Sequence, residues 1–391
     1  MKTKLVIFGI TGDLSTRKLL PALEHIMKRD DELTVIGVSR RDVGVSELLT
    51  SAIGHDVIAD RFSVFTMDLA QAGDYVDLKS YVDLRADEQA VVYLSVPPSS
   101  AADIVDFLGQ AGLNGANVKL LFEKPFGFDL ESAHDYIDRT SRYYEEGQIY
   151  RIDHYAAKEM AQEVFRQRAA GVPWDKDRVS SVSVVAAEAI GVEGRATFYE
   201  ETGALRDFIQ GHLMQLLSLV LMPVPDGSDM DKASEYRLVA LQNMKLADPS
   251  LTIRAQYQGY QEEVGNIGSL TETFVSMQLA SNDVSWQDVP LRLITGKSLN
   301  EKRSYIRIEY KDGTETIIEE GSIPMADTSY SDAYERVLVD AIEGRKGIFT
   351  TSPELLRAWE IVRPVQESWN MDNSALEIYA PGSSIDEVIK K

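Results

Sequence analysis

The chain of 391 residues contains no cysteine. Disulfide bonds, thiolate metal ligands and thiol nucleophiles are therefore excluded. Long hydrophobic runs are also missing, since no apolar stretch approaches the roughly 18 residues that a membrane-spanning helix requires. Residues 1–10 read as a strand and lack the layout of a signal peptide. We therefore expect a cytoplasmic protein that has no membrane partner.

Positive charge is scarce in this sequence. The chain has 40 Lys and Arg residues against 62 Asp and Glu, which gives a formal net charge of −22. This surplus of acid argues against nucleic acid and anionic membranes as partners. The 44% hydrophobic and 26% charged residues are ordinary for a globular protein, and the length favours two domains. An anionic ligand would need positive charge concentrated at one place.

The N-terminal residues have the pattern of a nucleotide-binding unit. Residues 4–8 form an apolar run, Gly9-Ile-Thr-Gly12 follows, residues 17–27 have helical spacing, and residues 33–38 form a second apolar run. Strand, glycine turn, helix and strand make the first βαβ unit of a doubly wound sheet, whose turn lets a pyrophosphate approach the helix N-terminus. Glycines also occur in tight turns without a ligand, so the prediction of a dinucleotide site depends on this context.

The end of the second strand bears on the choice of coenzyme. An acid at this point binds the ribose of NAD, whereas an arginine accommodates the 2′-phosphate of NADP. Here Arg40 and Arg41 precede Asp42. We predict NADP, with Arg40 the better placed, while Asp42 leaves NAD open as an alternative. A solvated basic loop is the other interpretation.

Two further apolar runs end at residues of interest. Residues 90–96 end at Pro97, and residues 118–122 end at Glu123 and Lys124. Because ligands of doubly wound folds bind outside the carboxyl ends of the strands, we expect Lys124 to contact a ligand. The peptide bond that follows Lys124 precedes a proline and is a candidate for the cis form.

The sequence changes character from about residue 150. Asp153, His154 and Tyr155 lead into an amphipathic helix that contains Lys158. If both are helical, His154 and Lys158 share one face, and with Tyr155 they offer donors suited to a phosphate monoester. The alternative is a solvated helix start that Asp153 caps.

Residues 203–222 predict a helix that is apolar except for a few side chains. Asp207 and His212 lie five residues apart within it. A satisfied core histidine is the alternative for His212. The remaining pattern predicts a sheet backed by helices, which indicates an α+β domain. Its strands are expected at 182–188, 271–279, 291–295, 305–310 and 315–319, and its helices at 333–342 and 353–368. We place the N-terminal α/β domain at 1–150 and the α+β domain at 151–391.

These residues carry a family resemblance along nearly the whole chain. The sequence resembles the glucose-6-phosphate dehydrogenase family, and the Arg151-Ile-Asp-His-Tyr155 segment with Lys158-Glu is highly specific. Other matching segments are Gly9-Ile-Thr-Gly12, Arg17-Lys18-Leu-Leu-Pro21, Glu123-Lys-Pro-Phe-Gly127, Glu193-Gly-Arg195, Gly203-Ala-Leu-Arg-Asp207, Gln210-Gly-His212, Trp286-Gln-Asp-Val-Pro290, Thr295-Gly-Lys-Ser-Leu-Asn300 and Asp332-Ala-Tyr-Glu-Arg336.

The resemblance implies a Rossmann-like domain followed by an α+β domain with a large, mainly antiparallel sheet. It implies oxidation of D-glucose 6-phosphate to 6-phospho-D-glucono-1,5-lactone with NADP, or NAD, in the oxidative pentose phosphate pathway, and it implies no metal. His212 is then the general base and Asp153 orients it. The implied substrate-binding residues are His154, Tyr155, Lys158, Glu188, Asp207, Lys297, Lys302 and Lys124. The implied coenzyme-binding residues are Gly9, Thr11, Gly12, Asp13, Leu14, Lys18, Arg40, Pro97 and Lys124.

The chain also departs from the family pattern. It is a shortened member, trimmed between Tyr310 and Tyr330 and after Ile385, in and near the sheet through which the family dimerises. We expect a homodimer or homotetramer. Small residues replace larger ones at Gly211, before the base, and at Ala101, near the nicotinamide. Ala156 and Ala157 replace the usual Leu-Gly of the phosphate motif.

Two other functions remain open from the sequence. One is a related dehydrogenase for another substrate, such as galactose 6-phosphate or a free aldose. The donors His154, Tyr155 and Lys158 argue against a free sugar, because without a phosphate they would be left unpaired. The other is a catalytically silent NADP-binding regulatory homologue, which would have no chemical reason to keep both Asp153 and His212.

Overall fold

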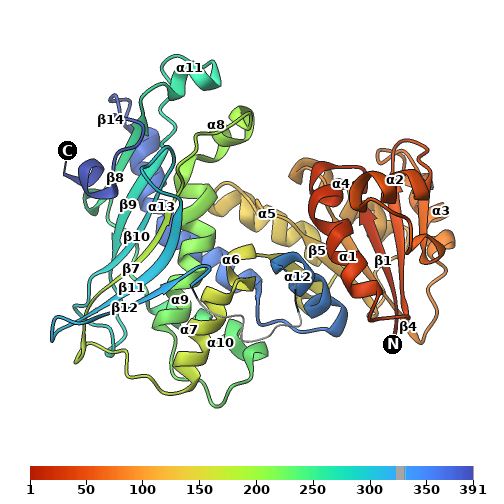
Figure 1. Ribbon diagram of the computed structural model, residues 1–391, viewed down its shortest axis with the longest axis horizontal. Coiled ribbons are helices and arrows are strands. Elements are labelled where there is room, and N and C mark those ends of the chain that lie inside the picture. The colour runs from red at the N-terminus through yellow and green to blue at the C-terminus, as the bar shows by residue number, and fades with distance from the viewer. Residues whose placement is uncertain (323–329, 331, 391) are drawn as a thin grey trace. The chain divides into compact units, whose positions relative to one another are not determined.

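A computed structural model describes residues 1–322, 330 and 332–390 (Figure 1). The chain forms two compact units. The first consists of residues 1–127, 131–157 and 327–352, and the second of residues 128–130, 158–326 and 353–391. Within the described residues, no helix combines the length and the apolar character needed to cross a membrane.

The first unit is built on a seven-stranded sheet in the order β13-β6-β5-β4-β1-β2-β3. Its strands β1 to β6 are parallel, and β13 pairs antiparallel with β6. The order 3-2-1-4-5-6 is that of a doubly wound dinucleotide-binding fold. Every residue of β4 is buried, as expected of a central parallel strand covered on both faces. The strands are β1 (Lys2–Phe8), β2 (Leu33–Ser39), β3 (Phe62–Thr66), β4 (Glu88–Leu94), β5 (Val118–Phe122), β6 (Ile149–Ile152) and β13 (Phe349–Thr350).

Helices cover this sheet in groups. The α1 helix packs against α2 and α12, and α3 packs against α4. The first helix expected from the sequence is divided, because a π-helical turn, η1, precedes α1. The helices of the unit are η1 (Ser15–Leu19), α1 (Leu20–Met27), α2 (Val45–Ile53), α3 (Ala72–Val82), α4 (Pro98–Gln110), α5 (Leu130–Ser141), α6 (His154–Ala157) and α12 (Ala333–Glu343).

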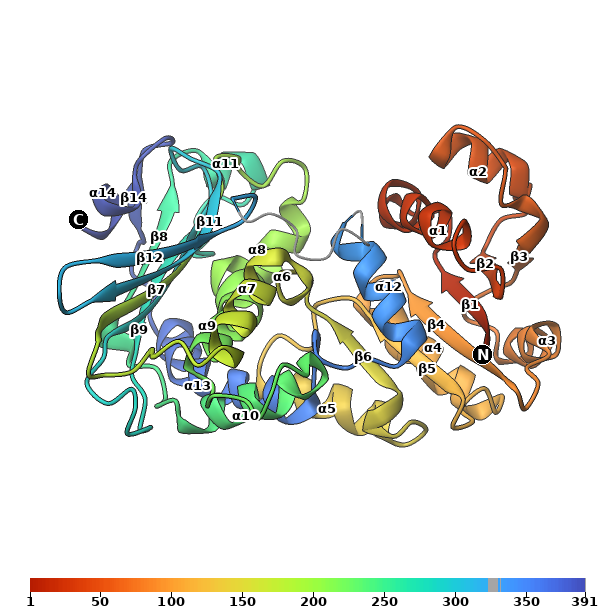
Figure 2. The same cartoon turned by 60° about the horizontal axis from the view of Figure 1, so that its bottom comes forward.

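The first unit takes in a late segment that the sequence analysis assigned to the second domain. Figure 2 shows α12, in blue, beside the strands and helices of the first unit. The reason is strand pairing: Phe349 and Thr350 of β13 pair with Ile152 and Arg151 of β6. A two-residue strand leaves no periodic signal in a sequence, so this return of the chain could not be predicted.

The second unit has a seven-stranded sheet in the order β12-β11-β7-β10-β9-β8-β14. Four of its six pairings are antiparallel, whereas β10 with β7 and β14 with β8 are parallel. The mainly antiparallel sheet expected from the resemblance is therefore confirmed. The strands are β7 (Val179–Ala187), β8 (Thr252–Tyr257), β9 (Phe274–Leu279), β10 (Leu291–Gly296), β11 (Arg303–Tyr310), β12 (Glu315–Glu319) and β14 (Glu377–Tyr379).

Helices back this second sheet. The α9 helix is buried along its whole length and packs against α7 and α10. The expected trimmed segment after Tyr310 lies in part outside the described residues. The helices are α7 (Glu159–Ala169), α8 (Ala196–Ala204), the π-helix η4 (Leu205–Leu213), α9 (Met214–Leu221), α10 (Ala233–Asn243), α11 (Tyr260–Val264), α13 (Ser352–Met371) and α14 (Ile385–Ile389).

Candidate active site

The glycine turn of the first unit follows β1 and is anchored to the end of β4. Gly9 has φ +76°, and a Cβ there would lie 2.1 Å from the main-chain oxygen of Ser95. The Ser15 hydroxyl donates a hydrogen bond of 2.9 Å to the Gly9 carbonyl. Only glycine satisfies both the backbone angle and this close approach. The turn is therefore locked against the neighbouring strand.

The expected coenzyme residues lie at the carboxyl ends of four adjacent strands. The direction of the crossovers reverses between β1 and β4, which is the point where doubly wound sheets bind ligands. Arg40 is exposed directly after β2, and Lys124 follows β5 with a cis peptide bond to Pro125, as the sequence allowed. Thr11, Gly12, Asp13 and Leu14 follow β1, Lys18 lies on η1, and Pro97 follows β4. Backbone N–H groups and basic side chains at this edge of the sheet are the donors that a dinucleotide requires.

Tyr334 of α12 links two of the expected site residues in the first unit. The Lys18 Nζ lies 5.9 Å from the centre of its ring, and the His154 ring lies 4.6 Å from it, centre to centre. Burial, with a smaller effect of Glu123, raises the pKa of the Tyr334 hydroxyl, so the phenol is neutral and can donate. Tyr334 belongs to a segment that resembles the family, but no local pattern indicates a role for it.

Glu123 is a second group that the sequence analysis passed over. Its carboxylate lies 3.7 Å from the Nε2 of His154 and accepts a hydrogen bond from the buried Tyr93 hydroxyl. Glu123 stands at the end of β5, directly before Lys124, so its position was a usable signal. Tyr93 lies within β4, between Val92 and Leu94. Neither of these apolar neighbours could have indicated the contact with Glu123.

Asp153 is only 3% exposed and directly precedes α6. Its carboxylate accepts a hydrogen bond of 2.9 Å from the N–H of Tyr155, so it caps the helix start as one interpretation expected. It is not a solvated cap, because the residue is buried. A buried, oriented carboxylate is the kind of group that can fix an imidazole.

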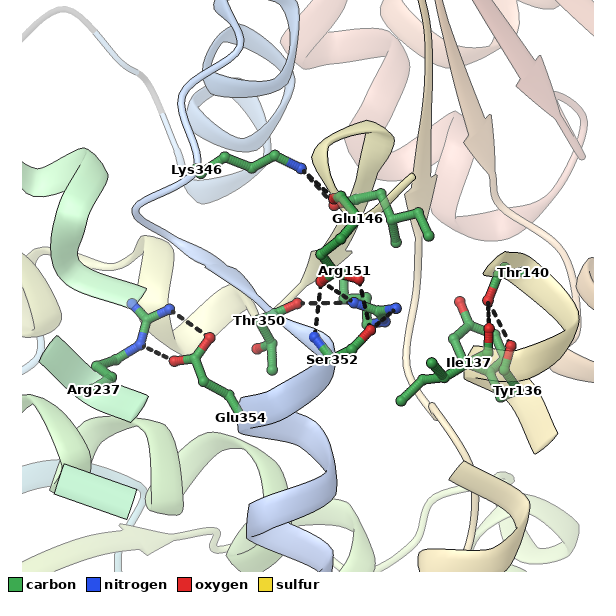
Figure 3. Close-up of polar contacts among 11 residues, drawn as sticks. Tyr136, Ile137, Thr140, Glu146, Arg151, Arg237, Lys346, Thr350, Ser352 and Glu354 are labelled. Carbon is green, nitrogen blue, oxygen red and sulfur yellow. Dashed lines mark hydrogen bonds and ion pairs between the residues drawn. The ribbon is translucent and has the colours of Figure 1, made fainter. Parts of the chain in front are cut away.

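The strand that leads to Asp153 is held by a buried arginine (Figure 3). Arg151 is fully buried and donates to the Glu146 carboxylate at 2.9 Å and to the Ser352 hydroxyl at 2.8 Å. Burial alone would raise the pKa of Glu146, but Arg151 and Ser352 lower it. The carboxylate is thus ionised and pairs with the guanidinium, which ties β6 to the late segment of the same unit.

One expectation about the phosphate residues is wrong. His154 and Lys158 do not share a helical face, because α6 ends at Ala157 and Lys158 has an extended backbone (φ −75°, ψ 159°) before α7 begins. An extended residue between two helices changes the direction of the chain, which the four-residue spacing cannot reveal. The Lys158 Nζ instead forms an ion pair of 2.8 Å with Glu320.

The expected continuous helix over 203–222 is also wrong. Gly203 has φ 60° and ψ 179°, and α8, the π-helix η4 and α9 replace a single α-helix. In an α-helix Asp207 and His212 would point about 140° apart. A π-helix bonds residue i to residue i+5, so these two residues lie about one turn apart on the same side of η4. The rings of His212 and Phe208 are steeply inclined to each other, with their centres 5.6 Å apart.

An ion pair between a buried lysine and a partly buried glutamate lies beside η4 in the second unit. Glu188 follows β7 and Lys297 follows β10, and because these strands are parallel neighbours their ends meet at one edge of the sheet. Lys297 is 1% exposed, pairs with the Glu188 carboxylate, and lies 6.0 Å from the centre of the Phe208 ring. Lys302 is exposed, one residue beyond the β11 pairing of Arg303 with Ala187. The structure thus gathers the expected sugar-binding groups around one end of the sheet.

The site residues divide between the two units. Asp153, His154 and Tyr155 belong to the first unit, and Lys158, Asp207 and His212 to the second. Among the residues that the structure describes, no three His, Asp or Glu side chains form a group that could hold a metal ion.

Family models match both halves of the chain. The model for the glucose-6-phosphate dehydrogenase NAD binding domain matches residues 6–163. The model for the glucose-6-phosphate dehydrogenase C-terminal domain matches residues 165–327 and 322–390. Together the matches span almost the entire sequence.

Curated relatives and a solved structure agree with these models. The glucose-6-phosphate 1-dehydrogenase of Gluconobacter oxydans (strain 621H) is 31% identical, over 97% of this chain and 93% of the relative. That of Dickeya dadantii (strain 3937) is 29% identical, over 97% and 94%. The crystal structure of the Mycobacterium avium enzyme superposes with a TM-score of 0.84 at 29% identity, covering 98% of this chain and 94% of that one.

A second solved structure shows the same fold with a TM-score of 0.90 at 23% identity; it is a glucose-6-phosphate dehydrogenase in complex with its substrate glucose-6-phosphate. The alignment with the Gluconobacter relative extends over 458 positions, more than the 391 residues of this chain. The relative therefore has residues for which this chain has no counterpart, as expected of a shortened member. With both domains matched in order, the chain belongs to the glucose-6-phosphate dehydrogenase family.

Proposed function

We propose that this protein is a glucose-6-phosphate 1-dehydrogenase, which oxidises D-glucose 6-phosphate to 6-phospho-D-glucono-1,5-lactone in the oxidative pentose phosphate pathway. The observation that supports this most strongly is the π-helix η4, which puts Asp207 and His212 on one side, next to the ion pair of Glu188 with the buried Lys297. Oxidation of the C1 hydroxyl requires a general base close to the sugar. In a member of this family, a histidine beside charged side chains that can bind the sugar meets this requirement.

We propose NADP as the coenzyme, with NAD as the alternative. When bound, its nicotinamide accepts the hydride from C1 of the sugar. The backbone from Gly9 to Leu14, with Thr11, Gly12 and Asp13, borders the pyrophosphate, and Arg40 binds the 2′-phosphate. Pro97, between β4 and α4, and Lys18, on η1, complete the proposed coenzyme site.

His212 takes the proton of the C1 hydroxyl as the general base. An imidazole suits this task because its ordinary pKa lies near neutral pH. Asp153 orients the imidazole and stabilises the imidazolium that forms, in the way that the aspartate of a catalytic triad does. Its burial and its bond to the Tyr155 N–H hold the carboxylate in one orientation.

The sugar phosphate is bound by two sets of side chains. His154, Tyr155 and Lys158 donate to the phosphate, and Lys124 lies where substrate and coenzyme meet. Glu188 and Asp207 accept hydrogen bonds from sugar hydroxyls. Lys297 and Lys302 supply donors, and the Glu188 carboxylate compensates the charge that Lys297 buries.

The assembly and location follow the sequence expectations. We propose a cytoplasmic homodimer or homotetramer whose partners are glucose 6-phosphate and the coenzyme, and which binds neither nucleic acid nor membranes. The net charge of −22 supports the last two statements.

A spectrophotometric assay of coenzyme reduction tests the proposed function. The purified protein should reduce NADP when glucose 6-phosphate is added, and reduce NAD less efficiently. Galactose 6-phosphate and free glucose serve as control substrates. Turnover with galactose 6-phosphate but not with glucose 6-phosphate, or no turnover with any sugar phosphate, would contradict the proposal.

A further inference from the structure

Glu272 is a buried carboxyl group to which neither the sequence nor the proposed mechanism assigns a role. It lies in the chain just before β9 and is 7% exposed. Its Oε1 accepts a hydrogen bond of 2.9 Å from the N–H of Leu205, the first residue of η4. Its main-chain oxygen accepts one of 3.0 Å from the N–H of Ala204. Glu272, which is distant in sequence, therefore accepts hydrogen bonds from two successive N–H groups at the start of the π-helix.

These bonds replace a cap that the helix itself does not provide. The first N–H groups of a helix have no partner within it, and a side chain at the N-cap position usually accepts from them. Here the N-cap residue is Ala204, which has no polar side chain. Glu272 thus performs from another segment the function that Ser, Thr, Asp or Asn performs in most helices.

Gly203 makes room for this carboxylate. Its backbone (φ 60°, ψ 179°) lies in a region that is essentially restricted to glycine. A Cβ at Gly203 would lie 2.5 Å from the Glu272 Oε1 and 2.8 Å from its Cδ. The turn before η4 and the carboxyl group that caps η4 therefore depend on each other.

From this geometry we propose that Glu272 is a positioning residue for the dehydrogenase reaction. By capping η4, it holds Asp207 and His212 on the same side of the π-helix, at the end of the sheet where Glu188 and Lys297 meet. This inference rests on the proposed function for its effect on turnover, but the cap itself is a property of the fold.

The cap requires an oxygen acceptor rather than a negative charge. Burial raises the pKa of Glu272, while the Leu205 N–H and the more distant Arg206 and Arg254 lower it. Both the neutral and the ionised carboxyl group keep an oxygen that can accept from Leu205. A glutamine keeps that oxygen without any charge, whereas a methionine of similar size lacks a comparable acceptor.

The test compares Glu272→Gln with Glu272→Met. We expect Glu272→Gln to keep kcat/KM for glucose 6-phosphate within about threefold of the wild type. Glu272→Met should lower it by about 10–100-fold, because a displacement of about 1 Å in a catalytic group costs on the order of 10²-fold. Binding of NADPH, followed by its fluorescence, should be unchanged in both variants, since the proposed coenzyme site lies in the first unit.

Glu263→Met is the matched control. Glu263 also lies in the second unit and also accepts from a main-chain N–H, that of Glu193 at 3.1 Å, and its other oxygen accepts from the Tyr257 hydroxyl rather than from the N–H that begins η4. We expect its kcat/KM to stay near that of the wild type. An equal loss in Glu263→Met and Glu272→Met would show a general effect of removing a carboxylate and would overturn the proposal.

A second readout does not depend on turnover. The chain has 5 histidines, so the imidazole C2–H resonance of His212 can be assigned by its loss in His212→Asn. We expect this resonance to move in Glu272→Met and to keep its position in Glu272→Gln. If the wild type shows no dehydrogenase activity, the proposed function fails, but the resonance still tests the cap.

Three results would overturn the role of Glu272. The first is a Glu272→Met variant that is as active as the wild type and has an unmoved His212 resonance. The second is an equal loss in Glu272→Gln, which would show that charge and not an acceptor is needed. The third is failure of either variant to fold, which would make Glu272 a requirement of the fold rather than a positioning residue.

Discussion

Each unit contains a π-helical segment that follows a glycine of positive φ, and the two differ in what that glycine faces. Before η1, a Cβ at Gly9 would meet the main-chain oxygen of Ser95 at 2.1 Å. Before η4, a Cβ at Gly203 would meet the side-chain oxygen of Glu272 at 2.5 Å. The first turn packs against backbone, and the second packs against a carboxyl group that also caps the following helix.

The difference matches the ligands that we propose for the two segments. The η1 turn offers main-chain N–H groups to a pyrophosphate, and its basic residues Arg17 and Lys18 are exposed. The η4 segment offers the side chains of Asp207 and His212, which must be held in one orientation. A site formed by main-chain N–H groups requires only that the turn has one conformation. A site formed by side chains also requires that the helix carrying them is held in one orientation.

The largest effect expected in this comparison comes from the base on η4. His212→Asn should lower kcat by about 10²–10⁴-fold, because it removes proton transfer to a general base. The KM for glucose 6-phosphate should change little, since Asp207 and the phosphate donors remain. Initial rates at saturating NADP measure both constants. Turnover near that of the wild type would break the assignment of the base.

Gly9→Ala tests the backbone turn before η1. The new Cβ cannot avoid the Ser95 main chain, so we expect a loss of about 3 kcal/mol or more of unfolding free energy and loss of NADP binding. Chemical denaturation and coenzyme fluorescence measure these. Gly73→Ala is the control, because a Cβ there meets nothing within 4 Å and the residue lies in the first turn of α3. Equal stability of the two variants would contradict the close packing of the turn.

Lys158→Ala tests the phosphate contact. Loss of a charge-assisted hydrogen bond should raise the KM for glucose 6-phosphate by about 10–100-fold without unfolding the protein. Glu320→Gln is the control: it removes the ion-pair partner of Lys158, so the KM should stay the same or fall. An unchanged KM in Lys158→Ala would remove this lysine from the substrate site.

Arg40→Ala should have a smaller effect, since Arg40 is exposed. We expect the KM for NADP to rise about tenfold and the KM for NAD to stay nearly constant, because only NADP carries the 2′-phosphate. Equal changes for both coenzymes would contradict the role of Arg40. The same variant should leave the KM for glucose 6-phosphate unchanged.

The last prediction concerns the pH dependence of stability, which has opposite signs for one buried group in each unit. Burial lowers the pKa of Lys346 in the first unit to about 7, although Glu146 opposes this. The unfolded chain then binds the extra proton, so this group makes the unfolding free energy rise with pH from about 7 to 10.5. Burial raises the pKa of Glu272, so the folded chain binds the extra proton, and this group makes the unfolding free energy fall as pH rises above 4.5.

Thermal unfolding of Lys346→Met and Glu272→Gln, measured from pH 4.5 to 10.5, checks the direction of each pH dependence. Relative to the wild type, Lys346→Met should lose the increase in unfolding free energy between about pH 7 and 10.5. Glu272→Gln should lose the decrease in unfolding free energy above pH 4.5. A constant difference between variant and wild type at all pH values would show that the group in question does not titrate differently in the folded and unfolded chains.

Much of the first unit could be predicted from the sequence alone. The apolar runs indicated parallel strands, because strands buried on both faces need continuous apolar residues. The glycine turn after the first run and Arg40 after the second indicated a doubly wound dinucleotide-binding sheet. The motifs around Asp153 and His212 led to the family and to the candidate residues. Local signals of this kind survive in a sequence because neighbouring residues produce them.

The orientation of these residues depends on backbone geometry and on contacts that the sequence does not reveal. The extended backbone at Lys158 and the π-helical turn at His212 changed which side chains share a face. Tyr334 reached the first unit, and Glu272 reached η4, from distant parts of the chain. An interpretation from sequence spacing assumes that a segment is a regular α-helix. It also requires knowing which other segment packs against that helix. Contacts between distant segments depend instead on how strands pair and helices pack, and no local pattern records them.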